Sequence, residues 1–152
     1  MVHTDRPRVL VLNGPNLDVL GTREPAVYGT HTLRDVEALV VARGQELGLD
    51  VDCSQSNSEG VLIDRLHAAR PTHAGLVLNA AGLTHTSVVL RDAVVASELP
   101  FVEVHITNVH AREPFRHTSL LSDLAQAVIA GAGIRGYAFG LEVLSDLLEQ
   151  RR

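Results

Sequence analysis

Glu103 and His105 form the clearest chemical anomaly in the sequence. They lie in residues 101–106, FVEVHI, whose apolar side chains predict a strand covered by helices. Side chains at positions i and i+2 of a strand share one face, so this carboxylate and imidazole can interact directly. The carboxylate would hold the imidazole in one tautomer and favour its protonated form, which prepares a general acid. A satisfied structural pair, or an edge strand that faces water, is the alternative.

Tyr28 is the second candidate, because it follows Arg23 by five residues in a glycine-rich stretch with no apolar period. A phenol, whose reference pKa is about 10, becomes a usable base only when a nearby cation stabilises the phenolate. Arginine supplies a positive charge that does not titrate away. An ordinary exposed loop tyrosine is the competing interpretation.

Further polar side chains follow the predicted strands. Asn13 and Asn16 come after the first strand, and Asn79 comes after the third, followed by the THTS segment that contains His85. Arg112 and Arg116 could clamp a carboxylate, or could be solvated charges on a surface helix. In an open parallel sheet, ligands bind beyond the carboxyl ends of the strands, where the strand order reverses. These side chains are therefore expected at one edge of the sheet.

Short Val, Leu and Ile runs alternate with helical periods, which predicts an α/β fold. Five strands and four crossovers indicate a flavodoxin-like, doubly wound, five-stranded parallel sheet of order 2-1-3-4-5, with helices on both faces. Thr32 and Ser58 are expected to cap the first two helices. Residues 1–152 are read as a single catalytic domain, with residues 1–7 as a flexible N-terminal extension. The predicted strands lie near residues 9–12, 49–53, 74–78, 101–106 and 127–130, and the predicted helices span 33–47, 59–69, 87–96 and 136–149.

Composition excludes several function classes. The chain has 13 Lys+Arg, all of them arginine, against 18 Asp+Glu, and this net charge of -5 argues against partners such as nucleic acid or an anionic membrane. The absence of lysine excludes a lysine Schiff base, a lysine-bound pyridoxal phosphate and a Walker-type phosphate loop. A single cysteine, and no apolar run of transmembrane length, make the cytoplasm the expected location.

Two further patterns have simpler interpretations. The GxGxxG spacing at residues 131–136 lies before the last helix rather than in an opening βαβ unit, so close packing of helix on sheet is preferred to dinucleotide binding. The histidines at 105, 110 and 117 lack a compact ligand spacing with carboxylate support, so no metal is expected.

The motifs taken together closely resemble type II 3-dehydroquinate dehydratase, over about residues 9–148. They are LNGPNLDVLGTREPAVYG, QSNSEG, NAAGLTHTS, EVHITNVHAREPFRH and the final GY. This resemblance implies a homododecamer built as a tetramer of trimers. It also implies dehydration of 3-dehydroquinate to 3-dehydroshikimate without a cofactor, as the third step of the shikimate pathway or a step of quinate catabolism.

The resemblance also implies roles for individual residues. The base falls on Tyr28, its activating arginine on Arg23, and the general acid on His105, which Glu103 would orient. Asn16 matches the residue that helps to stabilise the enolate through a bound water. Arg112 would help to form a lid over the substrate. The matched substrate-binding positions are Asn79, His85, Ile106, Thr107 and Arg116, together with Asp92, which would reach the site of a neighbouring subunit.

A non-catalytic flavodoxin-like binding module is the alternative function. A phospho-receiver usually needs a lysine beside an acidic pocket, and a flavin carrier needs aromatic side chains for stacking. The chain has no lysine and only five aromatic residues.

Overall fold

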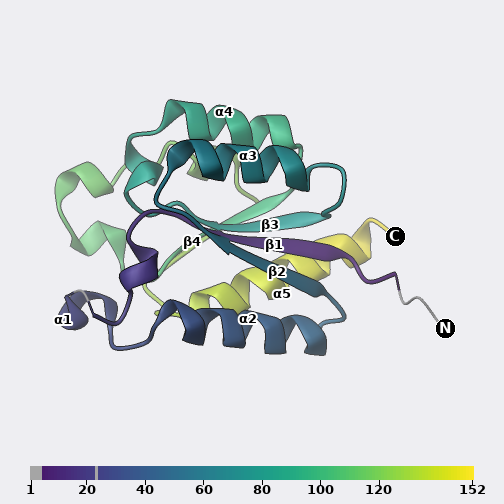
Figure 1. The fold of residues 1–152 in the computed structure, drawn as a ribbon, viewed down its shortest axis with the longest axis horizontal. Helices are drawn as coiled ribbons and strands as arrows, with labels where there is room; N and C mark the ends of the chain where they lie inside the picture. Colours follow the sequence, from purple (N-terminus) through teal and green to yellow (C-terminus); the bar gives the residue numbers. More distant parts are fainter. Residues whose placement is uncertain (1–4, 23) are drawn as a thin grey trace.

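The computed structural model describes residues 5–22 and 24–152, which form a five-stranded parallel sheet between two layers of helices (Figure 1). The strands are β1 (Arg8–Asn13), β2 (Asp50–Gln55), β3 (Gly75–Asn79), β4 (Phe101–His105) and β5 (Ala127–Ala130). The helices are the short α1 (Pro25–Tyr28), then α2 (Leu33–Glu46), α3 (Glu59–Ala69), α4 (Val88–Ser97) and α5 (Arg135–Gln150). Short 3-10 turns are η1 (Leu17–Val19), η2 (Ala81–His85), η3 (Val109–Ala111), η4 (Pro114–Arg116) and η5 (Ser122–Leu124).

The strand order is β2-β1-β3-β4-β5, which confirms the predicted topology. Every neighbouring pair is parallel, and the register aligns Asn13 at the end of β1 with Asn79 at the end of β3. The order reverses between these two strands, so both asparagines lie at the switch point where such sheets bind ligands.

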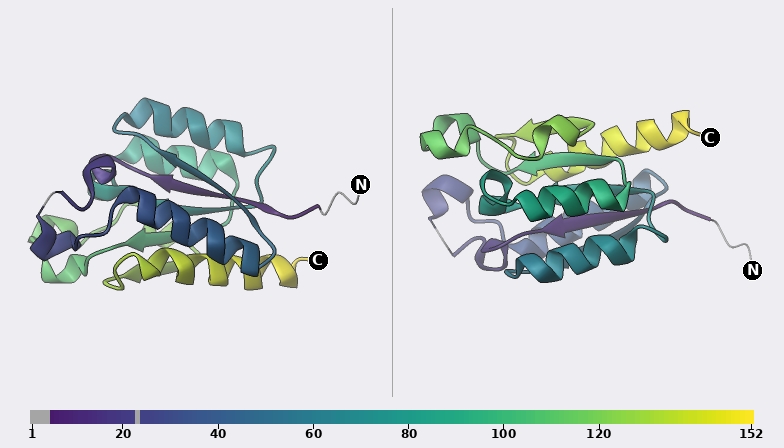
Figure 2. Two further views of the ribbon diagram at one scale, coloured as in Figure 1. Left: turned by 60° about the horizontal axis from the view of Figure 1, so that its bottom comes forward. Right: turned by 90° about the horizontal axis from the view of Figure 1, so that it is seen from above.

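Two apolar clusters lie on opposite faces of the sheet. Val9, Val11, Val77, Val102 and Val104 of the strands face α2 and α5, whereas leucines of β1 and β3 and Phe101 face α3 and α4. Alternation of side chains along each strand produces this division. Figure 2 shows the two helical layers in turn, first α2 with α5 and then α3 with α4. The three central strands β1, β3 and β4 are buried on both faces, as expected for parallel strands covered by two helical layers, whereas β2 and β5 at the edges are partly exposed.

Most helices and strands begin and end within two residues of the positions that the sequence predicted. Thr32 begins α2 with a capping box, and the Ser58 hydroxyl accepts from the N–H of Val61, so both predicted caps are confirmed. Ser87 was expected inside the third long helix, but it is the residue before α4. Its hydroxyl accepts from the N–H of Leu90 at 3.0 Å. A side-chain acceptor satisfies a free N–H of the first turn, so the helix begins one residue later.

The GxGxxG segment serves packing, as expected. A Cβ on Gly136 would lie 3.3 Å from Cγ2 of Ile129 and 3.5 Å from Cγ1 of Val104, so α5 approaches the sheet closely there. Gly131 has φ +86°, a left-handed conformation that favours glycine.

Residues 1–4 of the expected extension lie outside the described residues. The carbonyl of Pro7 accepts a hydrogen bond from the N–H of Asp50 at 2.9 Å, which joins the segment before β1 to β2. In residues 5–22 and 24–152, no helix combines the length and apolar character needed to cross a membrane.

Candidate active site

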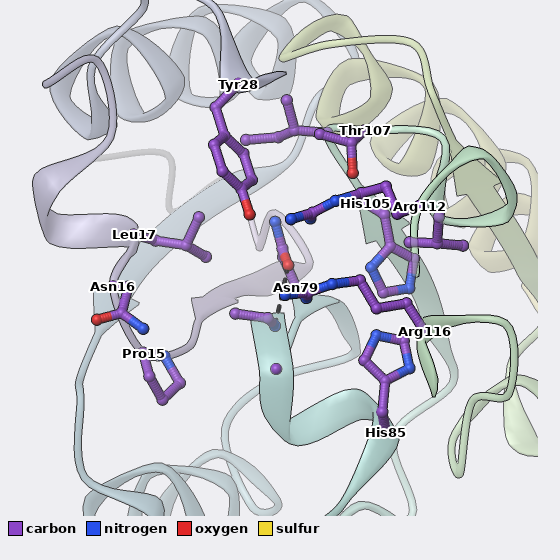
Figure 3. Close-up of a pocket in the computed structure, with 14 residues that line it drawn as sticks. Pro15, Asn16, Leu17, Tyr28, Asn79, His85, His105, Thr107, Arg112 and Arg116 are labelled. Atoms are coloured by element: carbon purple, nitrogen blue, oxygen red, sulfur yellow. Dashed lines mark hydrogen bonds between the residues drawn. The ribbon is translucent and has the colours of Figure 1, made fainter. Parts of the chain in front are cut away.

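One pocket lies beyond the carboxyl ends of β1, β3 and β4 (Figure 3). It has an empty volume of about 620 Å³, which includes space open to solvent. The sequence-predicted residues that line it are Asn16, Tyr28, Asn79, His85, His105, Ile106, Thr107, Arg112 and Arg116. Residues from distant parts of the sequence therefore meet at the edge where the strand order reverses.

The predicted pair of Glu103 and His105 is present and buried, with exposed fractions of 1% and 6%. His105 Nε2 and Glu103 Oε2 are 2.6 Å apart, the distance of a short charge-assisted hydrogen bond. Because Nε2 faces the carboxylate, Nδ1 is the ring nitrogen that remains available to form a hydrogen bond with a substrate. Of this pair, only His105 lines the pocket, and Glu103 contacts the His105 ring on the side away from the pocket.

Two serines complete the surroundings of Glu103. Ser119 donates its hydroxyl to Oε1 at 2.9 Å, and Ser122 donates to both carboxylate oxygens at 2.9 and 3.0 Å. Burial acts to raise the pKa of Glu103, but the hydrogen bonds from His105 and the serines, with the charge of His105, hold that pKa below its usual range. The carboxylate stays ionised beside the His105 ring.

Tyr28 ends the short helix α1, so the expected loop is helical at this residue. Its hydroxyl points toward the centre of the pocket, and the guanidinium of Arg112 lies over its ring at 5.1 Å from the ring centroid (Figure 3). Pro25 at the first position of α1 supplies a pre-set φ, which favours a helix in a segment without apolar periodicity. Arg23, the expected activating residue, lies outside the described residues.

The connection after β4 supplies further positive charge to the pocket. Arg116 donates from Nε to Glu113 Oε2 at 2.5 Å, and this contact lowers the pKa of Glu113.

His85, at the end of η2, lies beside His105. The ring of His85 stacks on His105 with centroids 6.2 Å apart, and its Nδ1 lies 2.8 Å from the carbonyl oxygen of Thr118. Two arginines near two histidines suit an anionic substrate with a polar leaving group.

Asn16 adopts a left-handed conformation with φ 71°, a region that asparagine tolerates. Its backbone N–H donates to Asn57 Oδ1 at 2.8 Å, and Asn57 in turn donates to Asp18 at 3.3 Å. These contacts hold the Asn16 backbone at the rim of the pocket.

Sequence reasoning missed several residues of the site. Pro15, Leu17, Ala81, Gly82 and Val109 also line the pocket, and each lies within three positions of a predicted site residue. Asp92 lies exposed on α4 and does not line the pocket of its own chain. Among the described residues, no group of three or more His, Cys, Asp and Glu side chains is arranged to hold a metal ion.

Comparison with known proteins decides the family. The model of dehydroquinase class II matches residues 7–145. The chain belongs to the class II dehydroquinase family. The chain is 62% identical over 144 residues to 3-dehydroquinate dehydratase 1 of Corynebacterium efficiens, in an alignment that covers 95% of each chain. It is 56% identical to catabolic 3-dehydroquinase 2 of Aspergillus flavus, which covers 96% of this chain and 99% of that one.

Solved structures agree with this membership. The chain superposes on the type II dehydroquinase of Propionibacterium acnes with a TM-score of 0.88 at 43% identity, over 91% of this chain and 96% of that one. The type II dehydroquinase of Butyrivibrio crossotus gives a TM-score of 0.89 at 36% identity, over 91% and 97%. Membership of an enzyme family favours a catalyst over the non-catalytic flavodoxin-like module.

Proposed function

We propose that this protein converts 3-dehydroquinate to 3-dehydroshikimate, with Tyr28 as base and His105 as acid, and without a cofactor or a Schiff base. The observation that carries the proposal is the meeting of the Tyr28 hydroxyl and the Glu103-held imidazole of His105 in one pocket with Arg112 and Arg116.

The reaction divides into two proton transfers. Tyrosinate at position 28 removes the carbon-bound proton next to the ketone, and the electron pair moves to the ketone oxygen to form an enolate. The enolate then reforms the ketone and a carbon–carbon double bond while the tertiary hydroxyl leaves. Protonated His105 donates its proton to this hydroxyl, which departs as water. Asn16 holds a water that donates to the enolate oxygen, and Arg23 stabilises the phenolate.

Substrate binding is assigned to the remaining polar residues of the pocket. Asn79, His85, Ile106, Thr107 and Arg116 bind the substrate, and Arg112 closes over it from the connection after β4. Support for this assignment is their presence around the pocket and the positive charge of both arginines.

Assembly and location extend the proposal. We infer a homododecamer of four trimers in which Asp92 reaches a neighbouring site. Asp92 lies exposed on α4 beside Val88, Val89 and Val95, which are 59%, 51% and 55% exposed. A large exposed apolar surface is typical of an interaction site. Sedimentation should give one discrete dodecamer-sized particle, and a fully active monomer would reject this role of Asp92. The cytoplasm is the proposed location.

Turnover of 3-dehydroquinate, followed by the near-ultraviolet absorbance of the enone product, tests the proposal. Tyr28→Phe keeps the ring and removes the ionisable oxygen, so turnover should fall by at least ~10²-fold, the lower range for a positioned general base. Thr22→Val is the matched control, because it deletes a hydroxyl of the same connection that donates to the carbonyl of Val19.

Two further measurements separate the parts of the mechanism. Arg23→Gln deletes the charge assigned to the phenolate, so the activity profile should move to higher pH. Borohydride treatment in the presence of substrate should leave the activity intact, because the chain has no lysine to form an imine. Near-normal turnover of Tyr28→Phe, or inactivation with a reduced adduct, would show the mechanism to be wrong.

A further inference from the structure

A buried chain of hydrogen bonds connects the C-terminal helix to the pocket. The Tyr137 hydroxyl donates to Asn13 Oδ1 at 2.6 Å and accepts from Asn79 Nδ2 at 2.8 Å. Asn79 Oδ1 accepts from the backbone N–H of Ala81 at 3.1 Å. Tyr137 comes from α5, is 0% exposed, and lies beneath the aligned ends of β1 and β3. Of the three polar side chains, only Asn79 lines the pocket.

The backbone N–H of Ala81, at one end of this chain, sets the direction of its bonds. The N–H of Ala81 can only donate, so the amide atom that faces it must be the oxygen of Asn79. The amide nitrogen then faces Tyr137, whose oxygen accepts because its single hydrogen goes to Asn13. Burial raises the pKa of Tyr137, so the hydroxyl keeps that hydrogen throughout the neutral pH range.

We propose that Tyr137 and Asn13 are positioning residues that lock the amide of Asn79 with an N–H available to the substrate. The inference rests on the proposed function and extends it by specifying that Asn79 donates, and does not accept, the hydrogen bond to the substrate. Asn79 Oδ1 is bound to Ala81 and one hydrogen of Nδ2 to Tyr137, which leaves the second hydrogen to donate. The substrate group at this point must therefore be a hydrogen-bond acceptor, such as a carboxylate or hydroxyl oxygen.

Loss of the lock has a defined effect on binding. Without the Tyr137 hydroxyl, the Nδ2 face of Asn79 loses its acceptor, and only the N–H of Ala81 still opposes a rotation that exchanges the amide oxygen and nitrogen. A rotated amide would turn an acceptor toward an acceptor. Tyr28 and His105 do not take part in the chain, so the chemical step should be less affected than binding.

A double-mutant cycle of Tyr137→Phe and Asn79→Ala tests the proposal. Tyr137→Phe should raise KM about tenfold and change kcat by less than about threefold, the range expected for one neutral hydrogen bond. In the Asn79→Ala background, the same substitution should leave KM unchanged, because the residue through which it acts is gone. An equal rise in KM in both backgrounds, or no rise in either, would overturn the proposal.

Two other variants distinguish positioning from general stability. Ser97→Ala also removes a buried hydroxyl, because Ser97 is 1% exposed. Ser97 lies at the end of α4, where its hydroxyl donates to the carbonyl of Val94 at 2.7 Å. The substitution should lower the free energy of unfolding without changing KM. Asn13→Leu removes the acceptor for Tyr137, so it should raise KM as Tyr137→Phe does. An unchanged KM would contradict the proposal that Tyr137 and Asn13 position the Asn79 amide. This variant also serves if Tyr137→Phe does not fold.

A spectroscopic measurement separates this inference from the proposed function. In the substrate-free ¹⁵N-labelled protein, Tyr137→Phe should shift the side-chain amide resonances of Asn79, assigned by their loss in Asn79→Ala. Unmoved resonances would refute the lock even in an active enzyme. Failure of the unmodified protein to turn over 3-dehydroquinate would refute the proposed function, while shifted resonances would still show that Tyr137 controls the Asn79 amide.

Discussion

Replacing Glu103 by glutamine tests the carboxylate that holds the imidazole of His105, the proposed general acid. Glutamine has nearly the same shape, and its oxygen can still accept from Ser119 and Ser122. Its amide nitrogen would then face His105 Nε2, where a carboxylate oxygen lies at 2.6 Å in the native protein. A buried charge-assisted hydrogen bond contributes about 1.5–3 kcal/mol, and truncating a buried ion pair costs about 3–5 kcal/mol. Loss of about 3 kcal/mol from the transition state corresponds to an approximately 10²-fold lower kcat.

The assay for Glu103→Gln is kcat at neutral pH, followed by enone absorbance. Asp52→Asn is the matched control. Asp52 also binds a histidine, with Oδ2 lying 3.0 Å from Nε2 of His73, but this pair lies outside the pocket. A Glu103→Gln enzyme with kcat within about threefold of the native value at neutral pH would refute the reasoning.

Three further outcomes are expected. Replacing Ser119 and Ser122 together by alanine should raise the pKa of Glu103 and lower kcat about tenfold, as pH-dependent kinetics would show, whereas an unaltered profile would exclude their role. Burial acts to raise the pKa of Asp52, but the hydrogen bond from His73 and the nearby arginine charge hold it below its usual range. The stability that Asp52 contributes is therefore complete above about pH 4, and it is lost as the pH falls through the lowered pKa of the folded state. Asp52→Asn should therefore make the free energy of unfolding, measured in urea, depend less on pH in acid. Ala81 has φ +53°, so Ala81→Gly should raise the free energy of unfolding by up to ~1 kcal/mol, and a lower midpoint in urea would contradict this.

Local patterns predicted the sheet and the Glu103–His105 pair because both depend on short-range periodicity. Parallel strands buried on both faces form continuous apolar runs, and residues two apart on a strand share a face. The helix at Tyr28 was not predicted, since its four residues have no apolar period. The Tyr137–Asn13 bond joins residues 124 positions apart, and no local pattern encodes such a distance.

The serines that hold Glu103 were missed for the same reason, since they contact it across 16 and 19 positions. Their residue type carries no chemical signal in a connection rich in arginine and histidine. The catalytic and substrate-binding roles assigned to the site residues stay predictions, and so does the dodecamer.

The connection between β4 and β5 supplies side chains on both sides of His105, the proposed acid. It contributes Arg112 and Arg116 to the pocket, and later Ser119 and Ser122 to the carboxylate beneath His105. Surface connections usually tolerate insertions and deletions. Here a one-residue change in length between Arg116 and Ser119 would shift the arginines relative to the serines. Engineering of substrate preference should therefore keep the length of this segment and exchange side chains within it, or transplant it whole together with β4.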